Sequence, residues 1–320
     1  MRLRPIPHAA AKGVAAMDKI FENILKEISA LPHENMAHSL RINGKGEKLK
    51  SSENISIVPK PEGNGIEVHV KANTKNESLH IPVIISQSGL TDLVYNDFFI
   101  DHDVDITIVA GCAIHNPKDK PSEHNGIHTF HVGENSKVKY FEKHYGEGAG
   151  SGKRILNPTT KLILGKNSSF NMNSSQIKGV SNSIRATECV LHENASLIII
   201  EKIFTNGNFS ATTKFTVLLE GDNSSVHVVS RAVAENTSTQ FFESKIAGNA
   251  KCFGHVECDA IIKDNAKVVA IPAIEANNVN ANLIHEAAIG KIAGEQILKL
   301  MTLGLSEKEA EEAIITGFLK

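Results

Sequence analysis

The sequence has no strong excess of charge of either sign. Its 320 residues include 34 lysines and arginines and 36 aspartates and glutamates, which gives a formal net charge of −2 and an isoelectric point near 6.7. No run of five or more like charges occurs. Proteins that bind nucleic acid or an anionic membrane usually carry a basic patch that shows in such counts. We therefore expect neither nucleic acid nor a membrane among the partners.

Cysteine and long apolar runs are also scarce. The four cysteines are separated by 77, 63 and 6 residues, which is not the dense framework of a disulfide-stabilised secreted protein. No apolar run reaches the roughly 20 residues of a membrane span. Residues 1–17 resemble an irregular extension, because no apolar core of a signal peptide follows Arg2 and Arg4. These absences predict free thiols and a cytoplasmic location.

Aromatic residues make up only 5% of the chain, and familiar catalytic motifs are missing. The stretch from Gly146 to Arg154 resembles a phosphate-binding loop, but Glu147 stands where the first glycine is needed, and Arg154 replaces the final Ser or Thr. A carbohydrate-active enzyme that uses the paired carboxylates of Glu257 and Asp259 is an alternative reading. With few aromatic rings for sugar stacking, we expect that the chain is not an enzyme.

Hydrophobic periodicity divides the chain into three parts. Near the N-terminus it predicts a short amphipathic helix between Asp18, as N-cap, and Pro32, as stop. From about Ser56 to Val279, short runs rich in Val, Ile and Thr are punctuated by Gly, Asn and Asp, which is typical of strands. Helical spacing returns after Asn280. The apolar residues at helical spacing are Ile20, Phe21, Ile24, Leu25, Ile28 and Leu31 in the first part and Ile289, Ile292, Ile297, Leu300 and Met301 in the last.

A second C-terminal helix is expected after Gly304. Ser306 and Glu309 have the spacing of a capping box, in which each side chain bonds the backbone N–H of the other residue. Two short helices at this place can cap the open end of a stack of strands and hide its unpaired edge. They can equally form a docking surface, and the residues alone leave both readings open.

One turn motif occurs seven times in the strand-rich region: a polar residue or Gly, then Asn, then two mostly small residues, then an apolar one. Its asparagines are Asn76, Asn135, Asn167, Asn194, Asn223, Asn249 and Asn265. From Asn135 onward the intervals are 32, 27, 29, 26 and 16 residues. Asn tolerates the left-handed conformation of a tight corner. The repeat therefore predicts a solenoid, best a parallel β-helix, whose rungs bury a continuous core. A β-sandwich with similar hairpin turns is the alternative.

Potential metal ligands concentrate between Lys251 and Leu298. They are Cys252, His255, Glu257, Cys258, Asp259, Glu275, His285 and Glu286. In a continuous strand Cys252 and Cys258 share one face about 20 Å apart, too far to bind one metal centre unless Gly254 bends the chain. A partner for Cys258 must then come from elsewhere, and we expect the chemistry at Cys258 and Glu286, with His285 beside them. Inert packing of a lone cysteine is the alternative.

A second group contains a cysteine and four histidines, Cys112, His115, His124, His128 and His131. The spacing matches no zinc motif. In a strand, His128 and His131 point to opposite faces. We interpret this group as structural or surface residues, and Cys189 as a small core residue.

Several separated blocks resemble the SufB/SufD family of iron–sulfur cluster scaffold proteins. They are Gly248 to Ile262, Ala270 to Glu275, Leu283 to Gln296, Leu303 to Ala310 and Gly317-Phe318, with Gly111-Cys-Ala and Lys137 to Tyr140 upstream. The resemblance covers roughly residues 100–320. It implies a right-handed parallel β-helix, pairing of two subunits through their β-helices, and a C-terminal helical segment that docks a SufC-type ABC ATPase. It favours docking over capping for the terminal helices.

The resemblance also implies roles for single residues. Cys258 falls on the SufB cysteine at which a nascent cluster is assembled, and Glu286 falls on the glutamate that works with it. His285 falls where the SufD partner carries a functional histidine. One chain with all three implies a compact homodimeric version of the SufB–SufD heterodimer, paired with a second copy or with a paralogue. Weaker candidate ligands are Cys252, Glu275 and Cys112.

The chain also departs from the family pattern. It is shorter than a typical SufB and lacks most of that protein's N-terminal region. Residues 160–165 contain no cysteine where SufB has one that is taken to accept sulfur. The sulfur donor, a cysteine desulfurase or free sulfide, is therefore left open.

Together these observations predict a scaffold that builds a transient iron–sulfur cluster at a subunit interface for transfer to apoproteins, driven by the ATPase. A thiolate is a soft ligand, whereas carboxylate and imidazole exchange more readily, which suits a cluster that must leave. The expected organisation is an extension with an amphipathic helix over residues 1–50, a β-helix core over 51–280 and a helical segment over 281–320. A SufD-like structural subunit that binds the ATPase without a cluster is the alternative.

Overall fold

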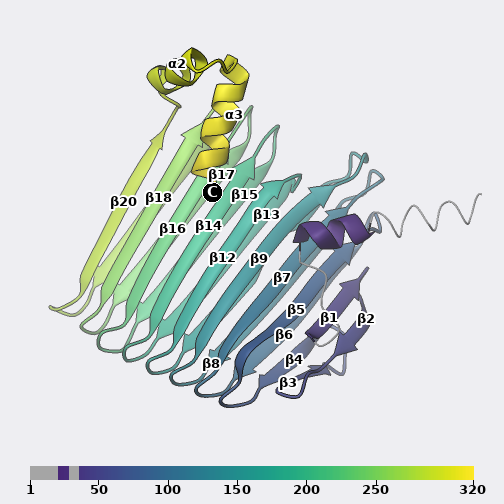
Figure 1. Ribbon diagram of the computed structural model, residues 1–320, viewed down its shortest axis with the longest axis vertical. Coiled ribbons are helices and arrows are strands. Elements are labelled where there is room, and N and C mark those ends of the chain that lie inside the picture. The colour runs from purple at the N-terminus through teal and green to yellow at the C-terminus, as the bar shows by residue number, and fades with distance from the viewer. Residues whose placement is uncertain (1–20, 29–35) are drawn as a thin grey trace, which may run out of the picture.

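A computed structural model describes residues 21–28 and 36–320 of the chain. Two long sheets lie face to face, and from β5 onward the chain alternates between them (Figure 1). Within each sheet, successive strands of the stack pair in parallel. This arrangement confirms the predicted parallel β-helix. It excludes the β-sandwich, in which neighbouring strands are antiparallel.

The first sheet, here called sheet A, has the order β2 (Lys45–Lys50), β1 (Ala37–Ile42), β5 (Lys75–Ile85), β7 (Asp105–His115), β9 (Lys137–Glu147), β12 (Ser169–Lys178), β14 (Ser196–Thr205), β16 (Ser225–Ala234), β18 (Phe253–Ile262) and β20 (Asn282–Gly290). Sheet B has the order β3 (Ile55–Pro59), β4 (Gly65–Val70), β6 (Thr91–Ile100), β8 (Ser122–Val132), β10 (Arg154–Leu156), β13 (Asn182–Leu191), β15 (Ser210–Leu219), β17 (Thr239–Gly248) and β19 (Lys267–Ala276), and β11 (Thr159–Leu164) also lies between β8 and β13. The pairs β1–β2 and β3–β4 at the N-terminal end are antiparallel.

Tight corners join the sheets, and most of the predicted asparagines shape them. Five of the seven have φ between 56° and 59°, in the left-handed region: Asn76, Asn135, Asn167, Asn194 and Asn223. Asn249 does not, and in the last motif Asp264 takes this conformation in place of Asn265. That motif lies between β18 and β19, at the opposite corner from Asn249, which explains the short final interval of 16 residues.

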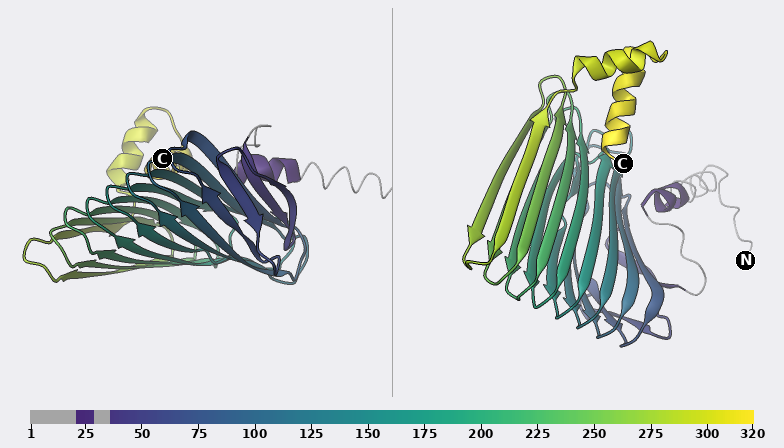
Figure 2. Two further views of the ribbon diagram at one scale, coloured as in Figure 1. Left: turned by 90° about the horizontal axis from the view of Figure 1, so that it is seen from below. Right: turned by 60° about the vertical axis from the view of Figure 1, so that its left-hand side comes forward.

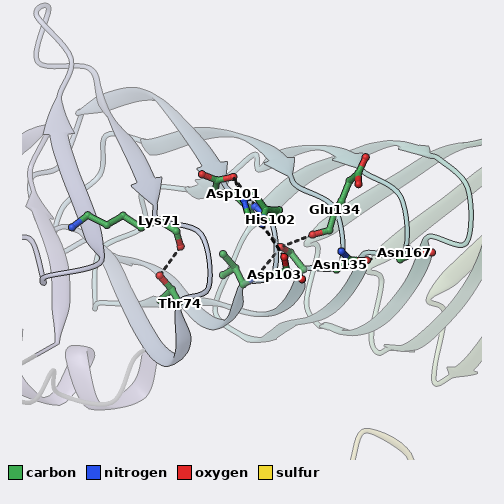
Figure 3. A network of polar contacts seen from close by, with 10 residues as sticks. Lys71, Thr74, Asp101, His102, Asp103, Glu134, Asn135 and Asn167 are labelled. Atoms are coloured by element: carbon green, nitrogen blue, oxygen red, sulfur yellow. Dashed lines mark hydrogen bonds and ion pairs between the residues drawn. The ribbon is translucent and has the colours of Figure 1, made fainter.

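Side-chain hydrogen bonds tie neighbouring corners together. The Asn167 Nδ2 donates to the Asn135 Oδ1 at 3.0 Å, and the Asn194 Nδ2 donates to the Asn167 Oδ1 at 2.9 Å. Figure 3 shows where this ladder meets the preceding corner, at which the Asp103 backbone N–H donates to the Glu134 carbonyl at 2.9 Å. Each corner therefore stabilises the next one, which keeps the strands of successive rungs in register.

The core is a continuous column between the sheets. Along each central strand buried residues alternate with half-buried or exposed ones, as in the pattern of β15, because successive side chains point to opposite faces. Several aromatic rings stack inside: Phe98 and Phe130 lie with centroids 4.3 Å apart, and Tyr140 and Phe170 pack beside them. Residues of successive rungs thus bury one another, as a solenoid requires.

The N-terminal helix packs on the outer side of sheet A. Residues 21–28 are helical and contact β5 and β7. A Cβ atom on Gly111 would lie 2.5 Å from the Ile28 carbonyl oxygen, so this close approach requires glycine. The predicted helix ends, Asp18 and Pro32, lie outside the described residues.

The C-terminal part differs from the expectation in one respect. Residues after Asn280 first form strand β20 and only then the helices α2 (Gly294–Thr302) and α3 (Glu307–Phe318). Pairing along nine residues with β18 outweighs the helical spacing of a short apolar segment. Ile289 therefore belongs to a strand. The capping box is confirmed: the Ser306 Oγ accepts from the Glu309 N–H at 3.3 Å, and the Ser306 N–H donates to the Glu309 Oε2 at 2.8 Å.

The terminal helices do not cap the end of the solenoid. Helix α3 lies against the outer face of sheet A, where Leu319 packs on Val233 and Ile261 and the Arg231 guanidinium donates to the Phe318 carbonyl at 3.2 Å. Within the described chain, β19 and β20 keep a free edge (Figure 2). Their side chains are mostly exposed. In the same described part, no helix combines the length and the apolar character needed to cross a bilayer.

Candidate functional site

Strands β18 and β20 carry the three main predicted residues and place them on two faces. Cys258 points into the solenoid and is only 2% exposed. It pairs with Ala287, two residues beyond His285, so Cys258 and His285 are diagonal neighbours on the inner face. Glu286 follows His285 directly and therefore lies on the outer face, opposite Glu257. The register places Cys258 and His285 on the same inner face and Glu286 on the outer face.

The environment of Cys258 keeps its thiol protonated. Burial raises its pKa to about 12, and the carboxylates of Glu201 and Asp259 add to the shift. A protonated thiol is neither a nucleophile nor a good metal ligand. Chemistry at Cys258 therefore requires that a metal displace the proton or that the end of the solenoid open.

His285 carries a neutral ring with a nitrogen that is free to bind a metal. Burial lowers the pKa of its half-buried ring, and the nearby His255 adds to the shift. The imidazole is therefore neutral near pH ~7. Its Nε2 is buried and has no hydrogen-bond partner among the described residues. A neutral ring with an unpaired nitrogen beside a cysteine is a competent ligand for iron.

A row of inward-pointing, mostly polar side chains crosses sheet A from β9 to Cys258 on β18. Strand register aligns Glu142, Ser174, Glu201, Ser230 and Cys258 on β9, β12, β14, β16 and β18. The Ser230 hydroxyl donates to the Glu201 carboxylate at 3.1 Å. Arg185, from sheet B, pairs with Glu201 at 3.2 Å and also with Glu142.

The pKa values of the two glutamates in this row are shifted in opposite directions. Burial alone would raise the pKa of Glu142, but the Arg185 guanidinium and the His144 ring lower it to about 2. Burial raises the pKa of Glu201 in spite of the same guanidinium. Sequence reasoning missed these residues because they belong to different rungs. Their signal, inward polar positions at the rung period, is visible only when the strand register is known.

The weaker candidate Cys112 lies elsewhere, on β7, which is separated from β18 by four strands of sheet A. Burial raises the pKa of its thiol. It borders a cavity of about 10 Å³, together with His124 and His128, which has room for at most one water molecule. His131 lies on the outer face and stacks on Phe99 with centroids 5.1 Å apart. His128 and His131 of β8 thus point to opposite faces, as predicted.

The other two weaker candidates also stay apart from Cys258. Cys252 immediately precedes β18, and both cysteines belong to the same core with no bend at Gly254, which is an ordinary strand residue. Glu275 on β19 is exposed and forms an ion pair with Lys245 at 2.8 Å. Neither residue joins the pair formed by Cys258 and His285.

Comparison with known proteins gives concordant matches. A family model described as "SUF system FeS cluster assembly, SufBD core domain" matches residues 94–318. An iron–sulfur cluster assembly SufBD family protein of Methanocaldococcus jannaschii is 26% identical over 317 residues, which is 94% of this chain and 98% of that protein. One from Pyrococcus horikoshii is 29% identical over 291 residues, 86% of this chain and 85% of the relative. A longer relative from Methanothermobacter thermautotrophicus is 28% identical over 245 residues, 74% of this chain but 57% of its own length.

Proposed function

The chain belongs to the SufBD family of iron–sulfur cluster assembly proteins, and from this premise we propose that it is a scaffold on which a nascent cluster is built. One observation carries the proposal. Cys258 and His285 share the inner face of the last two strands of sheet A, beside the free edge of the solenoid. A soft thiol and a neutral imidazole beside this edge suit the binding of iron and sulfide once the last rungs open or a metal displaces the thiol proton.

In this proposal two copies pair through their last rungs. The free edges of β19 and β20 expose apolar side chains such as Ile271, Ile274 and Ile289. Pairing would bring two sets of Cys258 and His285 to one interface, with Glu286 on the outer side of each edge strand. Imidazole and carboxylate ligands exchange more readily than thiolates, so the cluster would be transient and available to apoproteins. The scaffold itself is not an enzyme in this reading.

A SufC-like ABC ATPase is the proposed driver. None of the residues of α2 is buried within the described chain, and Leu298, Met301 and Leu303 expose apolar surface on and beside it. Helix α3 packs on the ends of β16 and β18, and β18 carries Cys258. A partner that binds α2 and pulls on α3 would open the last rungs. Exposure to water would then lower the pKa of the Cys258 thiol toward its ordinary value.

The remaining partners follow from the chemistry. Sulfur must arrive from a cysteine desulfurase or as sulfide, and the finished cluster must pass to apoproteins. We propose a cytoplasmic location, because the four cysteines are free thiols, as expected in a reducing compartment.

Anaerobic reconstitution with ferrous iron and sulfide tests the scaffold. The wild-type chain should develop a brown chromophore with bound sulfide. Cys258→Ser should lose most of it. Cys189→Ser should retain it, because Cys189 is equally buried but lies on β13, in the middle of the solenoid. Undiminished reconstitution by a folded Cys258→Ser protein would refute the assignment of Cys258.

A SufD-like structural subunit is the second candidate. It is favoured because Cys258, which lies within β18 near the free edge of sheet A, is buried, and burial raises the pKa of its thiol. Such a subunit would bind the ATPase but hold no cluster. Absence of a chromophore in the wild-type chain, together with intact ATPase binding, would select this alternative.

A further inference from the structure

A separate group of metal-ligating side chains lies on the outer face of sheet A, on the far side of the strands that carry Cys258. His227 is on β16, and His255 and Glu257 are on β18. One ring nitrogen of each histidine and one carboxylate oxygen of Glu257 lie within 4.8 Å of one another. All three residues are half-buried. The strand register fixes this juxtaposition, because His227 pairs directly with His255.

The donor atoms of this outer cluster converge on one carboxylate oxygen. The His227 Nε2 lies 2.8 Å from the Glu257 Oε1, and the His255 Nδ1 lies 3.6 Å from the same oxygen. The two imidazoles stack with centroids 5.1 Å apart and planes 4° apart. Ligands of one ion at metal distances of about 2.0–2.2 Å lie roughly 3 Å from each other. Small side-chain rotations would therefore convert this cluster into a coordination site.

The second nitrogen of His255 supplies an independent indication. Its Nε2 is buried and makes no hydrogen bond among the described residues, although the Glu286 Oε2 is only 3.6 Å away. Histidines that bind a metal usually donate their other N–H to a carboxylate, which fixes the tautomer. With a proton on Nε2 directed at Glu286, the Nδ1 lone pair of His255 faces Glu257.

A simple ion pair explains less of this geometry. One hydrogen bond satisfies His227 and Glu257 but leaves His255 in parallel contact with His227, and the His255 Nε2 makes no hydrogen bond to any residue that the structure describes. A second hydrogen bond to the same oxygen does not form, because the His255 Nδ1 is 3.6 Å from the Glu257 Oε1. A bound cation removes both difficulties, because it holds two neutral rings and one carboxylate together.

We propose that His227, His255 and Glu257 bind one divalent transition-metal ion, and that the ion is ferrous iron. Two imidazoles and one carboxylate with open positions are a donor set typical of non-haem Fe(II). The binding of a metal rests on these residues alone, whereas the choice of iron also rests on the proposed function. Because Glu257 and Cys258 are adjacent, the ion would lie on one side of β18 and the cluster ligand on the other.

Anaerobic titration of the full chain with Co(II), in a Cys258→Ser background, tests the site without the thiol. We expect one equivalent of bound Co(II), with visible d–d absorption and no thiolate charge-transfer band. His227→Ala and Glu257→Ala should each weaken binding by at least about tenfold, and Glu286→Gln, through the orientation of His255, by about 10–100-fold. His131→Ala is the matched control, since His131 is another outward histidine stacked in a ring pair. Excess Fe(II) should displace the Co(II).

The inference is overturned if a folded chain binds no Co(II), or if His227→Ala and Glu257→Ala, checked for native circular dichroism, bind it as tightly as the parent. If Zn(II) displaces Co(II) but excess Fe(II) does not, the choice of iron is wrong. The two proposals fail separately. Co(II) binding without reconstitution of a cluster in the wild-type chain would retain this site and remove the scaffold, and the converse result would do the reverse.

Discussion

At the scale of single residues, the solenoid interior contains many buried polar and charged side chains. Arg185 and Glu142 have side-chain exposures of 4% and 1%. Such burial is tolerated only when charges are paired, because removal of one partner leaves the other uncompensated in a medium of low dielectric. His144 and His128 lie close to this pair, and burial lowers the pKa of His144 to about 3 and that of His128 to about 4. The interior therefore holds neutral rings beside a guanidinium that is paired with two carboxylates.

Acidification should destabilise the fold through His128. Between its ordinary pKa of 6.5 and its folded value of about 4, the unfolded chain binds a proton that the folded chain excludes. This contribution to stability is complete above pH ~6.5 and declines as the pH falls toward about 4, by at most about 3 kcal/mol. Urea unfolding at pH ~7 and ~5 should show a smaller pH-dependent loss in His128→Leu than in the wild type.

The readout of this experiment is the difference between the two pH values and not the absolute stability. His128→Leu also loses the contact of the His128 Nδ1 with the Tyr140 hydroxyl at 2.9 Å, which lowers stability at both pH values. His131→Leu serves as control, because this ring lies on the outer face, and it should keep the wild-type dependence. Equal losses in wild type and His128→Leu would contradict the assignment.

At the scale of elements, corners and helix ends were predictable from the sequence, whereas the register between strands was not. The corners at Asn135 and Asn194 follow from one residue type that accepts the left-handed conformation. Asn236 at 59° was missed, although it stands in the similar stretch Glu235-Asn-Thr-Ser. The capping box at the N-terminus of α3 was likewise predictable, because its two partners, Ser306 and Glu309, are only three residues apart in the sequence.

The geometry of the candidate site could not be predicted from local sequence signals. Assigning helix after Asn280 concealed the alternation that sends His285 inward and Glu286 outward. The contact of His227 with Glu257 joins residues 30 positions apart, and only the parallel register brings them together. His255, Glu257, Cys258 and His285 were identified as candidate ligands by residue type, but His227 was missed. Their grouping into an inner pair and an outer cluster required the strand register.

Loss of the capping box should loosen α3 alone. In Ser306→Ala the Glu309 N–H loses its side-chain acceptor, which typically costs about 0.5–2 kcal/mol of helix stability. Amide hydrogen exchange across residues 307–318 should become faster, while exchange in the sheets is unchanged. Ser306→Thr keeps a hydroxyl acceptor and should exchange nearly as slowly as the wild type. Faster exchange throughout the sheets would show instead that α3 and the solenoid unfold as one unit.

At the scale of the whole molecule, the last two strands of the stack expose several apolar side chains. Val269, Ile271 and Ile274 on β19, and Ile284 and Ile289 on β20, are each between 38% and 48% exposed. Exposed apolar side chains beside an unpaired strand edge favour the addition of another strand. The proposed pairing of two copies rests on this surface.

Charge at the free edge should separate the copies. Lysine on an edge strand opposes strand addition, so the double substitution Ile271→Lys and Ile289→Lys should convert a dimeric wild type to a monomer in light scattering after gel filtration. Ile184→Lys is the control. Ile184 is 57% exposed but lies on β13 in the middle of the stack, and its substitution should leave the mass unchanged. A double variant that stays dimeric would place the interface elsewhere.

The antiparallel strands at the N-terminal end limit how far such association can go. There the outermost strands are β2, with Lys45, Lys48 and Lys50, and β3, which ends at Pro59. Short strands, lysines and proline all discourage the docking of another sheet. In the proposed dimer, a twofold axis would cover the free edges of β19 and β20 of both chains. The assembly would then close at two subunits and would not grow into a fibre.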